Sequence, residues 1–241
     1  MDPDATMPPL GETGRDRLVA LGKGAIGAIP YAGSILAEIV TQFIPVQRME
    51  RLEEYCRRLE ERLSRLEAGD LNERMKDPER IDLFEEGAIQ SARASSAERR
   101  AYIARIVAEG LTGDQQAAID ARRILKLLAE VDDDQIVILT SHLSRHLHDE
   151  KFYERHRSVL ESVGAHMGSD PDEVRRETMY ELARADLVRL GLLQTQYRQV
   201  KKGEIPEFDP RTGTMKGGRR TLSPLGHLLL VHLGIADAEE F

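Results

Sequence analysis

Tryptophan is absent from this 241-residue sequence, and aromatic residues make up only 5% of it. An aromatic platform for stacking nucleic-acid bases is therefore not expected. Cys56 is the single cysteine, which excludes an internal disulfide and a cysteine-ligated zinc ribbon and fits a reducing compartment. The 34 basic residues are outnumbered by 42 acidic ones, for a net charge of −8. This balance excludes a uniformly basic nucleic-acid coat but allows a local basic patch.

Sequence motifs of catalysis are missing as well. No glycine-rich loop leads into lysine followed by serine or threonine, and no serine stands in a GxSxG turn. The glycines at positions 22, 24 and 27 lack the strand–turn–helix context of a dinucleotide site. We therefore expect a protein that is not an enzyme and that carries no cofactor and no metal.

His142 and His146 have the spacing closest to that of a metal site, because residues four apart share one face of a helix. Leu143 stands where the metalloprotease motif has glutamate, and no third ligand has a fixed spacing from the pair. We interpret the two histidines as ordinary polar residues of a helix.

An apolar, glycine-rich stretch lies near the start of the sequence. Residues 1–17 are acidic and proline-rich, unlike a secretory signal, and we expect a disordered leader there. From Leu18 to Val46, Lys23 and Glu38 are the only charged residues. The run between these charges is shorter than the roughly 20 residues that span a bilayer. Pro30 should divide the stretch into a hairpin of two short helices.

The second helix of this hairpin has an apolar stripe, and two interpretations of the hairpin stay open. In the first, the hairpin is the buried core of a helical domain or packs against a partner chain. In the second, the hairpin leaves the core and enters a bilayer. Interior glycines cost about 1 kcal/mol each in a helix, so close packing or conformational change must favour them here. The candidate residues for membrane contact or self-association are Ile26, Ile29, Ile35, Leu36, Ile39, Val40, Phe43 and Ile44.

A charged helix follows Pro45 and completes an expected segment over residues 18–70. Its apolar positions alternate at spacings of three and four, as in a heptad seam, and glutamates and arginines pair at i,i+4 around them. The seam is short for a coiled coil, so it either packs within the chain or mediates self-association. The seam residues are Met49, Leu52, Cys56, Leu59, Leu63 and Leu66.

The central and C-terminal parts of the sequence also predict helices. A long connecting helix is expected over residues 77–112, with Pro78 in its first turn. Residues 114–241 are expected to form one helical module. Its predicted helices run from Asp114 to Val131, from Gln135 to Leu147, from Lys151 to His166 and from Pro171 to Leu190.

The last third of the chain resembles a winged-helix domain, in which a helix is followed by a strand, a turn-rich wing and a second strand. The residues that carry the resemblance are Leu187, Leu190, Gly191, Leu192 and Leu193 before the wing and Thr221, Leu222, Pro224, Gly226 and Leu229 after it. The resemblance implies a small β-hairpin and a module that binds DNA or protein.

Charge distinguishes these two kinds of partner. Residues 191–220 hold seven basic and three acidic residues, a balance suited to phosphate contacts. The helix before them is rich in acids, which favours a protein-interacting or structural role. The candidate nucleic-acid-binding residues of the wing are Arg198, Lys201, Lys202, Arg219 and Arg220.

The N-terminal pattern is similar to that of uncharacterised bacterial helical proteins with a glycine-rich apolar hairpin. The residues that carry this similarity are Ile29, Pro30, Gly33, Leu36, Glu38, Ile44, Pro45, Arg48 and Arg51, together with Leu222–Gly226 near the other end. The similarity implies a small bacterial protein and supplies no catalytic residues.

Together these features predict a mainly α protein: an apolar helical hairpin, a charged heptad helix, central helices, and a winged-helix-like module with a small β-hairpin. We expect a non-enzymatic protein whose hairpin engages a membrane or self-associates, as in a latent membrane-disrupting bacterial defence effector controlled by the module. The alternative is a winged-helix DNA-binding transcriptional regulator. The expected partners are a protein, a membrane, a second copy, or nucleic acid at the wing. The expected location is the cytoplasm or the periphery of the inner membrane.

Overall fold

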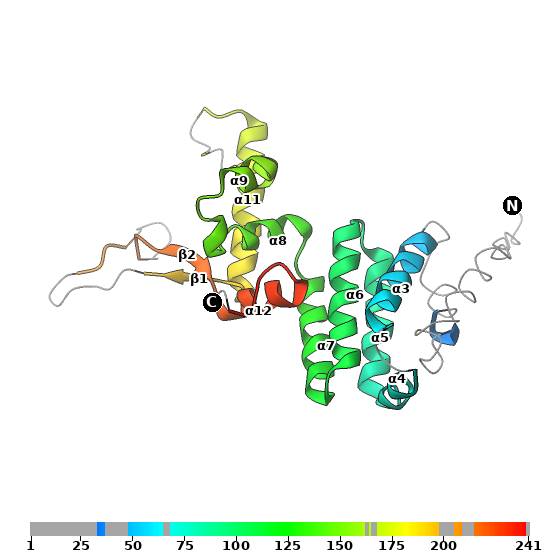
Figure 1. The fold of residues 1–241 in the computed structure, drawn as a ribbon. Coiled ribbons are helices and arrows are strands. Elements are labelled where there is room, and N and C mark those ends of the chain that lie inside the picture. The colour runs from blue at the N-terminus through cyan, green and yellow to red at the C-terminus, as the bar shows by residue number, and fades with distance from the viewer. Residues whose placement is uncertain are drawn as a thin grey trace, which may run out of the picture. The chain divides into compact units, whose positions relative to one another are not determined.

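The chain divides into two compact units, Met1–Glu130 (the N-terminal unit) and Val131–Phe241 (the C-terminal unit). The computed structural model describes residues 33–36, 48–64, 68–161, 164, 168–197, 205–208 and 215–239. These residues are mainly helical, as expected, and they include a two-stranded antiparallel sheet (Figure 1). Among them, no helix combines the length and the apolar character needed to cross a bilayer.

Four helices form the described core of the N-terminal unit: α3, α5 and α6 contact one another, and α7 packs on α5 and α6 (Figure 1). The short helix α4 follows α3. The bounds are α3 Met49–Leu63, α4 Ala68–Arg74, α5 Pro78–Arg93, α6 Ala97–Thr112 and α7 Gln115–Ala129. Asp77 and Asp114 cap α5 and α7 by accepting hydrogen bonds from backbone N–H groups in the first turn.

The expected heptad helix is confirmed as α3, and its seam lies inside the N-terminal unit. Met49 is 7% exposed, whereas Leu52, Cys56, Leu59 and Leu63 are fully buried; Leu66 lies outside the described residues. Since α3 contacts α5 and α6, this arrangement corresponds to the intramolecular alternative for the seam. Tyr55, which the heptad pattern omits, is fully buried too, with its hydroxyl 3.5 Å from the Phe84 carbonyl oxygen.

The single helix expected over residues 77–112 is wrong, because the chain breaks between α5 and α6. Ala94 and Ser96 have extended backbones, and the Ser96 side chain caps α6. Arg100 donates to the carbonyl oxygens of Ala94 (3.0 Å) and Ser95 (3.2 Å). The small polar residues in the middle of the predicted helix therefore form a capped turn that an arginine stabilises.

Glu54 connects this turn to the heptad helix. Its carboxylate accepts hydrogen bonds from Arg100 Nε (2.6 Å) and from Arg58 Nη2 (2.7 Å). The side chains of Glu54 and Arg100 are only 24% and 11% exposed. Burial alone would raise the pKa of Glu54, but the hydrogen bonds and charges of Arg58 and Arg100 outweigh it and lower that pKa below its ordinary value.

Gly87 lies where α5 meets both α3 and α6. A Cβ atom at this position would be 2.5 Å from Val107 Cγ2 and 2.7 Å from Tyr55 Oη. Both neighbours belong to the buried core, so they have little room to move. A glycine therefore allows the three helices to approach at this point.

The C-terminal unit begins with short helices and ends with a hairpin followed by a helix. The bounds are α8 Asp133–Thr140, η3 Ser144–His146, α9 Glu150–Arg155, α10 Arg157–Leu160, α11 Pro171–Arg189, β1 Leu193–Gln196, β2 Arg219–Leu222 and α12 Pro224–Leu233. Leu193 pairs with Leu222, and Gln196 pairs with Arg219. Helix α7, which the sequence analysis assigned to the C-terminal module, lies in the N-terminal unit.

Two predicted helices of this unit are wrong in length. The helix expected to reach Leu147 ends at Thr140, whose hydroxyl bonds back to the Ile136 carbonyl oxygen, and Leu143 is extended. The helix expected over residues 151–166 is two short helices that end at Leu160. Helix α11 is confirmed, with Asp170 as its cap.

Ser223 and Gly226 join the hairpin to α12. The Ser223 hydroxyl accepts from the Gly226 N–H (2.9 Å) and donates to the Gly191 carbonyl oxygen (2.5 Å). The Ser223 N–H donates to the Leu192 carbonyl oxygen. A Cβ atom on Gly226 would overlap that same oxygen of Leu192, so only glycine allows this corner to close.

We expect Glu54→Gln to lower the free energy of unfolding by about 2 kcal/mol at neutral pH, in the range of hydrogen bonds to charged groups. Because the folded pKa lies below the ordinary value of 4.5, the stabilisation is complete above that value and is lost as the pH falls through the folded pKa. Urea denaturation at about pH 7 and about pH 3 measures the difference between variant and wild type, which should shrink in acid.

Glu61→Gln is the matched control on α3. Its carboxylate pairs with Arg57, but both side chains are more than half exposed, so the loss should stay below about 1 kcal/mol. Equal losses for Glu54→Gln at both pH values would contradict an ionic role for Glu54.

We expect Gly87→Ala to destabilise the N-terminal unit by about 1–3 kcal/mol, the usual cost of overpacking a core. Ser91→Ala, one turn later on α5, is the contrast. The Ser91 hydroxyl is fully buried and has no hydrogen-bond partner among the described residues, so its removal should be neutral or stabilising. Denaturant midpoints compare the two variants, and similar losses in both would argue against the close approach at Gly87.

Candidate functional site

Most of the candidate membrane or self-association residues lie outside the described part of the chain. They are Ile26, Ile29, Ile39, Val40, Phe43 and Ile44. Ile35 and Leu36 belong to a described helical segment, residues 33–36, in which Leu36 is buried. The role of the apolar segment therefore stays a prediction from the sequence.

The described part of the wing has fewer available charges than the sequence suggests. Arg198, Lys201 and Lys202 lie outside the described residues, whereas Arg219 and Arg220 lie on β2. Arg219 is exposed. Arg220 lies 3.2 Å from the carboxylate of Glu181 on α11, and its side chain is only 26% exposed. Its guanidinium is therefore held within the unit by a carboxylate that Arg184 also binds, at 2.7 Å.

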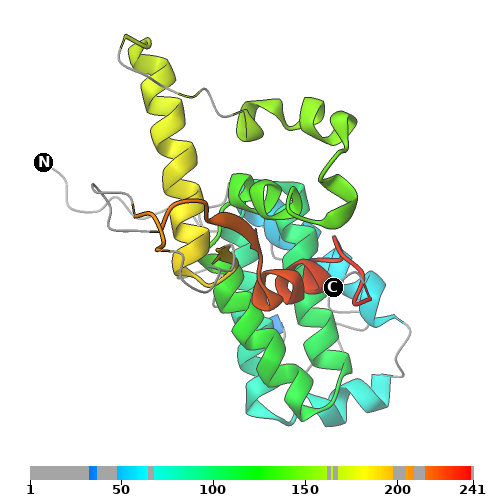
Figure 2. The ribbon, with the colours of Figure 1, turned by 90° about the vertical axis from the view of Figure 1, so that its left-hand side faces the viewer.

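Helix α11 precedes the hairpin, and its surface is exposed and partly apolar. Leu187 is its one buried side chain. Val174, Met179 and Leu182 are 44%, 57% and 51% exposed. In Figure 2 the N-terminal half of α11 stands apart from α9 and α10. Exposed apolar side chains interspersed with paired charges are typical of a surface that contacts protein.

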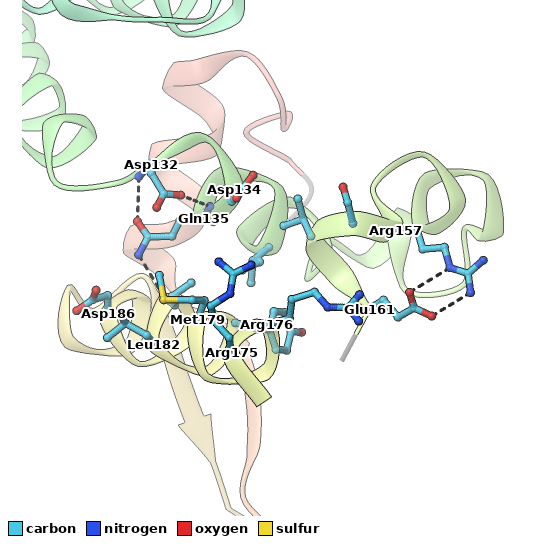
Figure 3. Close-up of a pocket in the computed structure, with 15 residues that line it drawn as sticks. Asp132, Asp134, Gln135, Arg157, Glu161, Arg175, Arg176, Met179, Leu182 and Asp186 are labelled. Carbon is cyan, nitrogen blue, oxygen red and sulfur yellow. Dashed lines mark hydrogen bonds and ion pairs between the residues drawn. The ribbon is translucent and has the colours of Figure 1, made fainter. Parts of the chain in front are cut away.

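A pocket of about 300 Å³ lies beside α11, between that helix and α8 and α10 (Figure 3). Its apolar lining comes from Ile138, Val159, Met179, Tyr180, Leu182 and Ala183. Its charged lining comes from Asp132, Asp134, Asp186, Glu161, Arg157, Arg175 and Arg176. None of its lining residues is histidine, cysteine or lysine. An apolar floor with charges of both signs suits contact with another polypeptide.

The α8 side of this pocket is rich in negative charge. Asp132 caps α8 by accepting from the Gln135 N–H (2.7 Å), and the Gln135 side chain donates to the Ala183 carbonyl oxygen of α11 (3.4 Å). Burial and the charges of Asp132 and Asp133 raise the pKa of Asp134. A raised carboxyl pKa means that added positive charge here is favourable.

His142 and His146 do not share the helical face that their spacing predicts, because α8 ends at Thr140. His142 Nδ1 lies 2.9 Å from the Ile138 carbonyl oxygen, and burial lowers the pKa of His142 despite this hydrogen bond. His146 stacks on Phe152, with ring centroids 4.2 Å apart. In the described ranges no group of three or more His, Cys, Asp or Glu residues could hold a metal ion.

Phe152 and its neighbours were missed by the sequence analysis. His156 also contacts the Phe152 ring, at 4.6 Å between centroids, and the Asp149 carboxylate lies 3.1 Å from His146 Nδ1. The spacing of Asp149 and Phe152 is that of a helix cap followed by its first turn. That signal is visible in the sequence, whereas the ring contacts depend on the turn before α9.

Comparison with known proteins gives this chain no relative. It matches no protein family, no curated protein and no solved structure. The pocket beside α11 and the wing are therefore interpreted from their own geometry and charge.

Because Glu181 holds Arg220 against α11 and the helix before the hairpin is rich in acids, we expect the wing to add little to binding of duplex DNA. The variant K201A/K202A/R219A/R220A should bind a duplex as the wild-type chain does, with the same dependence on salt. Fluorescence anisotropy at several salt concentrations measures both. A loss of affinity with a salt slope reduced by about 0.9 for each lost phosphate contact would instead establish the DNA-binding alternative. Circular dichroism checks that the variant is folded.

Proposed function

We propose that this chain is a non-enzymatic interaction protein in which the apolar segment 18–46 engages a membrane, alone or as an oligomer, under control of the C-terminal unit. The observation that carries the proposal is a contrast in charge. The segment has only Lys23 and Glu38 as charged residues. Ion pairs are frequent along the described helices on its C-terminal side.

The packing of α3 supports a separate role for the segment. Helix α3 begins at Met49, shortly after Val46, and its seam is buried against α5 and α6. Glu54 and Arg100 fix the helix further. The buried seam thus anchors α3, which follows the apolar segment in the sequence, within the N-terminal unit. The apolar residues of the seam are already covered by α5 and α6.

The element order of the C-terminal unit supports a winged-helix-like interaction module. Helix α11 leads into β1, β1 pairs antiparallel with β2, and β2 leads into α12. This is the order of helix, wing and closing helix that the sequence resemblance implies. The Arg220–Glu181 ion pair and the exposed Met179 and Leu182 favour a protein partner over DNA.

This arrangement suits a latent membrane-disrupting effector in a bacterium, the source that the N-terminal resemblance implies. In the resting state the C-terminal unit restrains the apolar segment. Binding of a partner to that unit releases the segment, and the membrane then stabilises its exposed form. Any such shift requires that the partner bind the released state more tightly than the resting one.

Liposome flotation of the full chain tests membrane engagement, because aggregates do not float. We expect the wild-type chain to float with vesicles at low and high salt. Ile39→Glu with Phe43→Glu should reduce the bound fraction at least about tenfold, since a carboxylate in the hydrocarbon costs about 3 kcal/mol. The control variant L147E/L228E changes two leucines that are 40% and 46% exposed in the C-terminal unit, and it should float as the wild type does.

The remaining outcomes also decide the proposal. In one of them, the wild-type chain forms oligomers that do not float, and I39E/F43E dissociates these oligomers. This result supports the segment as a self-association element instead of a membrane anchor. A monomer that does not float overturns the proposal. Loss of the helical circular dichroism signal in I39E/F43E, with L147E/L228E intact, makes the segment part of the core and overturns it as well.

A further inference from the structure

Helix α11 carries a second heptad seam, and this one is exposed. Its positions alternate at spacings of three and four and therefore share one face of the helix. Met179 and Leu182, at its centre, are more than half exposed. The seam residues are Asp172, Arg175, Met179, Leu182, Asp186 and Arg189.

The order of residues in this seam is self-complementary when one copy is reversed. Pairing about a centre between Tyr180 and Glu181 places Met179 opposite Leu182 of a second copy. The same centre places Arg175 opposite Asp186, and Asp172 opposite Arg189. Apolar residues thus meet in the middle and opposite charges meet on both sides. Parallel pairing would place each charge against its own kind, which is unfavourable.

We propose that the exposed seam of α11 is a docking surface for a second copy of this chain, which binds through its own α11 in antiparallel orientation. The two copies are related by a two-fold axis, so every contact occurs twice. This inference does not rest on the proposed membrane function, because it uses only residues of the C-terminal unit.

The charged residues of the seam form exposed ion pairs within one chain, which intermolecular ion pairs can replace. In one chain Asp172 lies 3.7 Å from Arg175, and Asp186 lies 3.1 Å from Arg189. The arginine side chains are 74% and 63% exposed. Ion pairs this exposed contribute little to stability, so intermolecular pairs can replace or share them at low cost.

The pocket beside α11 adds charge complementarity. In Figure 3, Asp132, Asp134 and Asp186 lie towards one end of the pocket, and Arg157 and Glu161 lie towards the other. The antiparallel copy would bring its Arg175 to Asp186 at the acidic end. Burial and the neighbouring Asp132 and Asp133 raise the pKa of Asp134 there, and an added arginine would relieve this excess of negative charge.

Charge reversal tests this pairing in the full chain by sedimentation velocity. R175D and D186R each place two pairs of like charges across the two-fold axis, and each should weaken the dimer at least about tenfold. The double variant R175D/D186R restores both intermolecular pairs and should regain wild-type affinity to within about threefold. Charge repulsion inside the helix persists in the double variant, so recovery there reports contact between copies.

Arg123 and Asp120 of α7 supply the matched control. They form an i,i+3 ion pair of 3.3 Å with similarly exposed side chains, outside the proposed surface. R123D, D120R and their double variant should leave the dimer unchanged. Oligomers held together by the apolar segment would survive all the reversals, so failure of this inference is distinguishable from failure of the proposed function.

Disulfide trapping tests the register. Cys56 is fully buried, and burial raises the pKa of its thiol to about 12, so it does not compete. Mixed M179C and L182C chains should form the 179–182 disulfide in preference to either same-residue disulfide. A wild-type chain that is monomeric at all concentrations tested, a double variant that fails to recover, or no preference for the mixed disulfide would each overturn the proposal.

Discussion

The contact of Arg100 with Glu54 holds the described N-terminal unit in one arrangement. A single guanidinium binds the carboxylate of α3 and the carbonyl oxygens of Ala94 and Ser95 at the break between α5 and α6. Without it, the turn would lose partners for its backbone, and the heptad helix would lose one of its polar links to the helix pair. The turn joins the two helices, α5 and α6, against which the heptad seam is buried.

Local rules account for most of the elements that the sequence predicts. Asp77, Asp114 and Asp170 cap helices where an acid precedes an expected helix, because such caps depend only on neighbouring backbone. The break after Ala94 also has a local signal, the Ser96 cap of α6, but its stabilisation by Arg100 depends on an arginine that reaches across to α3. The early end of α8 at Thr140 depends in part on bonds from hydroxyl groups to the preceding turn, which compete weakly with helix continuation.

The candidate site likewise combines features that local sequence predicts with features that depend on tertiary contacts. The sequence pattern placed Arg219 and Arg220 in the turn-rich wing, whereas both lie on β2. The ion pair between Arg220 and Glu181 required the hairpin to lie against α11. The seams of α3 and α11 have the same spacing and opposite exposure. Apolar periodicity identifies the buried seam. The exposed one has charges at four of its six positions, and it becomes recognisable only when Met179 and Leu182 are seen to lack cover within the described residues.

The corner at Ser223 and Gly226 has a mechanical consequence. Hydrogen bonds from Ser223 and the tight approach of Gly226 to Leu192 connect β2 to α12 without a flexible joint. Leu229 and Leu230 anchor α12 by their burial. Force that displaces the hairpin would therefore rotate α12 as a rigid element instead of bending the chain at the corner. The displacement would reach the buried apolar side chains of the C-terminal unit.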